Sequence, residues 1–113
     1  MSDARPLKQV DLLRHELKAL RYICENYHAR KIAPEALPPM ADFMTPQGRE
    51  IYQTIMHSPD RETAETALKH LDLENVDIGS FLRLSGEHYY SYPALVIERA
   101  AAIRSGALKV AAA

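Results

Sequence analysis

The sequence is poor in cysteine and glycine and has no long apolar run, which argues against several large classes of protein. Cys24 is the one cysteine, so no disulfide can form within the chain, and we expect a reducing, cytoplasmic setting. Glycine occurs only 4 times and runs of β-branched residues are absent, which argues against an all-β fold. No apolar run approaches the roughly 20 residues that span a bilayer, and the first residues do not resemble a secretory signal. We therefore expect a soluble protein or an excised domain of one.

Neither sign of charge is in excess. The 113 residues carry 14 basic and 15 acidic side chains, which gives a formal net charge of -1. A module that coats DNA or RNA is usually strongly basic, so the balance argues against that class and leaves only a local basic patch open. The length and the 47% of hydrophobic residues indicate one helical domain over 1–113, with 1–6 and 111–113 frayed.

The most regular pattern in the chain predicts a long first helix over 8–27. Apolar residues recur there at alternating steps of three and four, which places them along one face of a helix. These residues are Val10, Leu13, Leu17, Leu20, Cys24 and Tyr27. The polar residues of the same stretch are assigned to the solvent side: Arg14, Glu16, Lys18, Arg21 and Glu25.

A proline-rich loop over 31–40 separates this helix from a second one. Three prolines in the loop prevent a continuous helix, although 34–37 can form one helical turn. Phe43 then anchors the chain in the core, Thr45 caps the next helix and Pro46 occupies its first position. That helix runs to about His57, with Ile51, Tyr52, Ile55 and Met56 on its apolar face.

Three further helices are expected in the second half of the chain. Ser58 is predicted to cap a helix over 59–71, and Asp77 to cap a short one that ends at Gly86. A last long helix begins at Pro93. The order predicts an all-α, compact bundle of about five or six helices, in which the first and last are long.

The residues offer no convincing catalytic or metal site. Cys24 and His28 are one helical turn apart, but a closed zinc site needs four ligands and no second pair at metal-like spacing occurs. Cys24 lies on the apolar face of the first helix, which argues for burial and against a nucleophile. There is no glycine-rich phosphate loop and no serine flanked by glycines. We expect no enzyme, no catalytic residue, no metal and no cofactor.

Two binding functions remain open as alternatives. The segments 61–71 and 77–85 can be read as the helix-turn-helix of a small DNA-binding transcriptional regulator, but Arg83 is the only basic residue in the second segment. The apolar face over 10–27 can also pair with its own copy, as in a self-associating helical adaptor, although it is short for a coiled coil.

Tyr89, Tyr90 and Tyr92 form the most unusual local feature. Tyrosine is favoured at protein interfaces because a rigid apolar ring carries a polar tip, so the cluster predicts a contact surface. The alternative is that two of the three close one end of the bundle. Arg99 and Arg104 follow on the last helix and complete the predicted partner-binding set of Tyr89, Tyr90, Tyr92, Arg99 and Arg104.

The layout resembles the small helical domain at the N-terminus of the bacterial replicative helicase DnaB, which is similar to the C-terminal domain of the primase DnaG. The resemblance spans about 10–105. The residues that carry it are Glu16-Leu17, Asp42-Phe43, Thr45-Pro46, Arg49-Glu50-Ile51-Tyr52 and Tyr92-Pro93. The first helix is longer and more polar than in the helicase domain, and the loop over 31–40 is unusually rich in proline. The chain contains no ATPase motor, so the resemblance implies a non-catalytic interaction domain of DNA replication that docks on replicative helicase, primase or loader.

Overall fold

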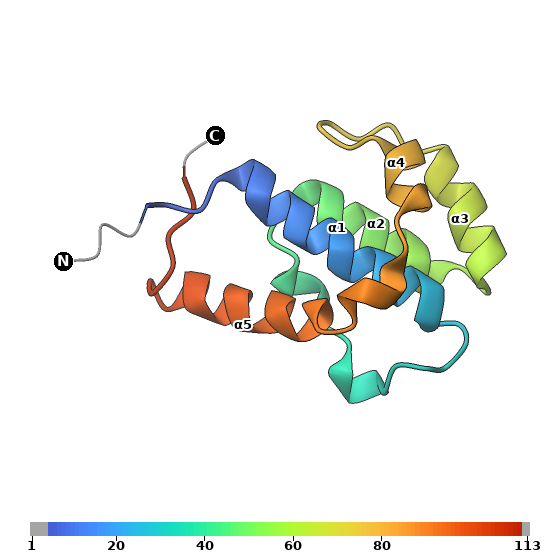
Figure 1. Ribbon diagram of the computed structural model, residues 1–113, viewed down its shortest axis with the longest axis horizontal. Helices are drawn as coiled ribbons and strands as arrows, with labels where there is room; N and C mark the ends of the chain where they lie inside the picture. Colours follow the sequence, from blue (N-terminus) through green and yellow to red (C-terminus); the bar gives the residue numbers. More distant parts are fainter. Residues whose placement is uncertain (1–4, 112–113) are drawn as a thin grey trace.

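The computed structural model describes residues 5–111, which form an all-α bundle as the sequence predicts (Figure 1). Five α-helices and three single turns of 3-10 helix (η) are found in this range. The helices are α1 (Gln9–Asn26), α2 (Pro46–His57), α3 (Arg61–Lys69), α4 (Ile78–Arg83) and α5 (Tyr92–Arg104). The turns are η1 (Pro34–Ala36), η2 (Met40–Asp42) and η3 (Gly86–Tyr89). No helix within 5–111 is long and apolar enough to cross a membrane.

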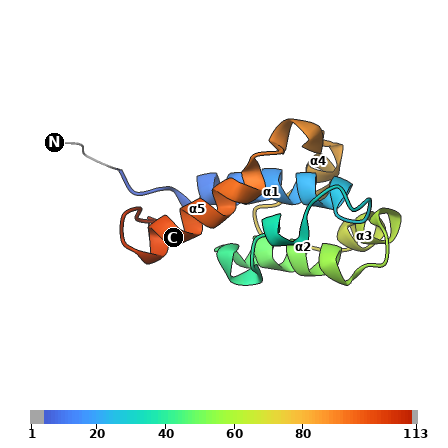
Figure 2. The ribbon, with the colours of Figure 1, turned by 90° about the horizontal axis from the view of Figure 1, so that it is seen from below.

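The long helix α1 is the axis on which the other elements pack. It contacts α2, α3, α4, α5 and η3. Figure 1 shows α5 running antiparallel to the first half of α1, with α3 and α4 gathered at the other end. Figure 2 shows α2 beneath the layer that α1 and α5 form. Near the two ends of the described range, Leu7 N–H donates to the Lys109 carbonyl at 2.7 Å and Ala111 N–H donates to the Leu7 carbonyl at 2.8 Å. Ala111 is thus held in place; 1–4 and 112–113 lie outside the described residues.

The core forms between α1 and α2, as the apolar patterns predict. Phe43 is fully buried, and its ring centroid lies 4.5 Å from that of Tyr52. Ile51 and Ile55 are also fully buried. On α1 the predicted apolar face is correct for Leu13, Leu20 and Cys24, which are buried. Val10 departs from the prediction, since its side chain is 48% exposed. Val10 lies in the first turn of α1 and lines an open cleft at this end of the helix.

Side-chain caps set the starts of three of the five α-helices, α2, α3 and α4. The Thr45 hydroxyl accepts a hydrogen bond from Gly48 N–H at 3.0 Å, with Pro46 at the first position of α2, as predicted. Asp77 caps α4 by accepting from Ser80 N–H at 3.2 Å, also as predicted. The helix turn expected within 34–37 is present as η1. The predicted start of the last helix, Pro93, is one residue after the observed start of α5 at Tyr92.

The predicted cap of α3 is wrong. Ser58 ends α2 instead, and its hydroxyl donates to the Thr54 carbonyl at 2.7 Å. The cap is Asp60, whose carboxylate accepts from Thr63 N–H at 2.7 Å, so the helix begins after Pro59. Both residue types are good caps, and the turn of the preceding helix had already engaged the serine hydroxyl.

Two polar residues of α1 that were assigned to solvent are buried. Glu16 is 1% exposed and Arg21 is 4% exposed. Glu16 accepts hydrogen bonds from the backbone before α2, and Arg21 donates to Glu65 of α3 at 2.8 Å and to the Leu84 carbonyl at 2.9 Å. Helical periodicity cannot identify such residues, because their partners lie far away in the sequence. Each one ties α1 to another element of the bundle.

Candidate functional site

Two of the three clustered tyrosines pack against each other where η3 leads into α5. The rings of Tyr89 and Tyr92 meet edge to face, with their centroids 5.2 Å apart. Both side chains are partly buried. Tyr90 does not join this pair, and it is 73% exposed, which makes it the most exposed large hydrophobic residue among those described. We call Tyr89, Tyr90 and Tyr92 the tyrosine corner.

Two basic side chains of α1, Lys18 and His15, lie beside the Tyr92 ring. The Lys18 ammonium lies 5.6 Å from the ring centroids of both Tyr89 and Tyr92. The His15 ring lies one turn earlier on α1, with its centroid 5.3 Å from that of Tyr92. Arg99 follows on the same side of α5 as Tyr92. Burial lowers the pKa of His15, and the nearby charges of Arg99 and Lys18 lower it further. We call His15, Lys18 and Arg99 the basic cluster.

The charge of the basic cluster is not matched by nearby carboxylates. Among residues 5–111, neither Lys18 nor Arg99 has an acidic group within 4.0 Å. The Nη1 atom of Arg99 is buried and has no hydrogen-bond partner. Two cations without an acidic partner are suited to an anionic group, which would match their charge.

Three acids near the basic cluster make contacts elsewhere, whereas Glu98, next to Arg99 in the sequence, is exposed. Asp11 pairs with Arg14, with 3.9 Å between Oδ1 and Nη1. Arg99 shares a hollow of about 10 Å³ with Glu16 and Asp42, among other residues. Glu16 accepts hydrogen bonds from the start of α2, and Asp42 is bound to an arginine of α5. None of these three carboxylates is available to neutralise Lys18 or Arg99.

Arg104 lies apart from the other residues of the predicted partner-binding set. Its Nη1 atom lies 2.6 Å from Oδ1 of Asp42, and its Nη2 atom donates to the Ala41 carbonyl at 2.7 Å. These bonds hold the end of α5 to η2, although half of the Arg104 side chain stays exposed. The structure therefore groups Tyr89, Tyr92 and Arg99 but leaves Arg104 at the other end of the helix.

The sequence did not identify His15 and Lys18 as part of this site. Their spacing of three residues places them on one face of α1, and this was the available signal. Nothing local indicates that α5 and η3 return to that face, because α5 is separated from α1 by most of the chain.

A shallow apolar groove lies on the other side of α5, next to Tyr90. Its volume is about 270 Å³, and Lys31 is the only charged residue that lines it. Tyr22 of α1 and the start of α5 form part of its wall. The apolar and aromatic lining includes Tyr22, Ile32, Tyr90, Pro93, Ala94 and Ile97. The groove and the basic cluster thus lie on two sides of the first turns of α5.

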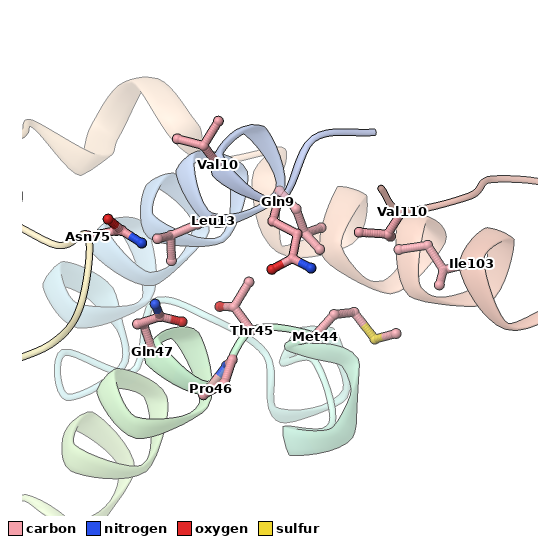
Figure 3. A pocket seen from close by; sticks show the side chains of 11 residues that line it. Gln9, Val10, Leu13, Met44, Thr45, Pro46, Gln47, Asn75, Ile103 and Val110 are labelled. Carbon is pink, nitrogen blue, oxygen red and sulfur yellow. The ribbon is translucent and has the colours of Figure 1, made fainter. Parts of the chain in front are cut away.

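A second cleft, of about 310 Å³, lies at the opposite end of α5 (Figure 3). Its walls come from the first turns of α1, the start of α2 and the end of the described chain. Val10, Leu13, Met44, Ile103 and Val110 are its apolar lining. Two amides at the rim serve the fold: Gln47 donates to the Glu74 carbonyl at 2.8 Å and Gln9 donates to the Ala111 carbonyl at 3.2 Å. The cleft carries no ionisable side chain, so it offers no acid–base chemistry.

The helix pair considered for DNA binding has few free basic groups. The segment 77–85 folds as the short helix α4, in which Arg83 donates to the Ser80 hydroxyl at 3.2 Å. On α3, Arg61 lies 3.5 Å from Glu65 and 4.0 Å from Glu25. Arg61 is thus paired with acids within the protein, while Lys69 and Arg83 are exposed.

Cys24 lies in the core and away from His28. Burial raises the pKa of the Cys24 thiol to about 11, even though the charge of Arg21 acts in the opposite direction. His28 instead bonds through Nε2 to the Ser58 carbonyl at 2.8 Å. Across residues 5–111, no three His, Cys, Asp or Glu side chains are grouped so that they could hold a metal ion.

Comparisons of the chain with protein-family models, with curated proteins and with solved structures find no match.

Proposed function

We propose that this protein is a non-catalytic protein-interaction domain that docks through the tyrosine corner and the basic cluster. The observation that carries the proposal is the position of Tyr90, which is 73% exposed beside an apolar groove. Lys18 lies over the rings of Tyr89 and Tyr92, and neither Lys18 nor Arg99 has an acidic group within 4.0 Å among the described residues. Tyrosine and arginine dominate the binding energy of many interfaces, because they combine a large contact area with hydrogen bonds. A partner would cover the Tyr90 ring and compensate the unmatched charge.

The resemblance to the helicase and primase domains supports a setting in bacterial DNA replication. We infer that the partner is the replicative helicase, the primase or the helicase loader, and that the encounter takes place in the cytoplasm. The domain would act by presenting the surface of α5 and η3, without a catalytic step. A bundle anchored by buried hydrogen bonds on α1 is a suitable rigid support for such a surface.

Binding to purified components tests the proposal. Calorimetry with purified bacterial replicative helicase, primase and loader should show binding to one of them. Tyr90→Ala should weaken that binding by about tenfold or more, since an exposed interface tyrosine commonly contributes above 1 kcal/mol. Met40→Ala, at another exposed apolar residue, serves as the control and should bind normally.

The result can also contradict the proposal. Absence of binding to all three proteins would exclude the replication setting. Equal binding by the wild type and Tyr90→Ala would exclude the tyrosine corner as the docking surface. A salt-sensitive shift of random-sequence DNA, without binding to any of the three, would instead favour the DNA-binding regulator.

A further inference from the structure

The basic cluster has the geometry of a receptor for carboxylate groups. We propose that His15, Lys18 and Arg99 bind the acidic side chains of a partner segment whose apolar residues enter the groove beside Tyr90. This inference rests on the proposed function and adds the chemistry of the partner.

The position of Lys18 is the first support. Its ammonium lies over two tyrosine rings at 5.6 Å, an arrangement that holds the cation in place by cation–π attraction without neutralising its charge. A fixed cation loses little side-chain entropy when an anion binds, so the ion pair gains more than one between two mobile surface side chains.

Arg99 supplies the second support. Its guanidinium has no acidic group within 4.0 Å among the described residues, whereas the neighbouring acids Glu16 and Asp42 are bound to other groups. The Nη1 atom is closed to solvent, so a partner carboxylate would bind the remaining nitrogens of the guanidinium. The charge of Arg99 would then be matched in the complex.

The surroundings favour an acidic protein segment over a nucleic acid. A phosphate backbone needs a run of cations along its length, and this chain has a net charge of -1 with Glu98 beside Arg99 on α5. The other side of α5 offers Tyr90, Ile97 and the apolar groove, with Lys31 as its one charged residue. An acidic segment with apolar anchors matches both sides, because its carboxylates and its apolar side chains have separate binding positions.

The experiment uses two short synthetic peptides of equal length. Both have leucine at every third or fourth position; the first has glutamate at the other positions and the second has glutamine. Fluorescence anisotropy measures the binding of each to the full chain, and NMR follows the rings of His15 and Tyr92. We expect the glutamate peptide to bind and the glutamine peptide to bind at least about tenfold more weakly, since hydrogen bonds to charged groups are the stronger class.

Matched variants locate the binding. Lys18→Gln and Arg99→Gln should each weaken binding of the glutamate peptide by about tenfold. Lys69→Gln, which removes an exposed cation of α3, should leave the affinity for this peptide unchanged. On binding, the pKa of His15 should rise toward its ordinary value, because a carboxylate would offset the charges of Lys18 and Arg99; Asp11 is the other charged group that acts on this ring. Circular dichroism confirms that each variant is folded.

Several outcomes would overturn the inference: equal binding of the two peptides, binding of neither, normal binding by Lys18→Gln and Arg99→Gln, or preferential binding of a thymidine oligonucleotide. Failure of this inference can be told apart from failure of the proposed function. If a replication protein binds the wild type, Lys18→Gln and Arg99→Gln equally well but does not bind Tyr90→Ala, the docking function holds and the acid specificity is wrong. If the glutamate peptide binds at the cluster and no replication protein does, the acid specificity holds and the replication setting is wrong.

Discussion

The buried carboxylate of Glu16 accepts a hydrogen bond from the Thr45 hydroxyl at 2.5 Å, and the same hydroxyl accepts one from Gly48 N–H at 3.0 Å. Glu16 also accepts from Met44 N–H at 2.6 Å. An acid of α1 and the cap of α2 thus form one continuous chain of hydrogen bonds. This chain fixes the start of α2 against α1 and so sets the angle at which the two central helices meet.

Removal of the Glu16 carboxylate should be strongly destabilising. In Glu16→Ala the N–H groups of Met44 and Thr45 and the Thr45 hydroxyl lose their acceptor, so we expect the free energy of unfolding to fall by about 3 kcal/mol. Glu16→Gln keeps one acceptor oxygen and should lose less. Urea denaturation at neutral pH, followed by circular dichroism, measures both. Glu50→Ala, on the exposed side of α2, is the control and should change stability little.

The same residue should give the protein a distinctive pH dependence. Burial raises the pKa of Glu16, and this outweighs the hydrogen bonds from Thr45 and Met44, which lower it. The folded state therefore binds the proton more tightly than the unfolded state, whose glutamates titrate at about 4.3. The stability that the raised pKa of Glu16 contributes is fully present below about pH 4.3, and it is lost as the pH rises through the pKa that Glu16 has in the folded state. In Glu16→Gln the free energy of unfolding should not show this loss as the pH rises. If the free energies of unfolding of the variant and the wild type change in parallel with pH, the raised pKa of Glu16 is contradicted.

Gly48 should be intolerant of a methyl group. A Cβ atom at Gly48 would overlap Oε1 of Glu16 and lie 2.8 Å from Oγ1 of Thr45. We expect Gly48→Ala to lower the free energy of unfolding by about 1–3 kcal/mol, although alanine is otherwise the better helix former. Gly79→Ala in α4 is the matched control, because its closest contact would be Asp77 Oδ1 at 3.3 Å. A melting temperature that rises in both variants would show that Gly48 has room.

Arg21 should be essential to the packing of α3 on α1. Burial raises the pKa of Glu65, but the hydrogen bond and charge of Arg21 outweigh it and hold that pKa below its ordinary value. The corresponding stability is present above about pH 4.3 and is lost as the pH falls. Arg21→Met should cost about 2–4 kcal/mol at neutral pH, because Glu65 keeps only its longer pair with Arg61 at 3.5 Å and the Leu84 carbonyl loses its donor. The free energy of unfolding of Arg21→Met should also fall less in acid than that of the wild type.

The control for Arg21 is Arg14→Met, which affects an arginine whose side chain is 71% exposed. Exposed ion pairs contribute about 0–1 kcal/mol, so this variant should unfold nearly as the wild type does. Equal losses in Arg14→Met and Arg21→Met, measured by urea denaturation, would show that the buried pairs have no special role.

Cys24 should be inert in the folded protein. Burial raises the pKa of its thiol to about 11 and also removes it from solvent. Reaction with a thiol reagent at pH 8 should therefore be slow in buffer and complete in concentrated urea. Absorbance of the released aryl thiolate follows both rates. Rapid labelling in buffer would show that this part of α1 opens readily.

Local sequence information was sufficient for the helices and most of their ends. Caps and prolines act within one turn of the residues they affect, so Thr45, Pro46 and Asp77 could be assigned from their neighbours alone. The apolar spacing also identified the core residues Ile51 and Ile55, because a helix carries an apolar face where another element covers it. Ser58 and Asp60 are both good capping residues, and the local sequence alone could not decide which of them caps α3.

The sequence by itself thus determined that the chain is an all-α bundle and where its helices lie. Only the tertiary structure decided which polar residues are buried and which cations gather at Tyr92. Glu16 meets Thr45 across 29 residues and Arg21 meets Glu65 across 44 residues, so no periodicity within α1 distinguishes them from solvated neighbours. Lys18 joins the candidate site only because α5 packs back along α1. Helix formation depends on neighbours in sequence, whereas burial and charge matching depend on contacts that exist only once the helices have packed.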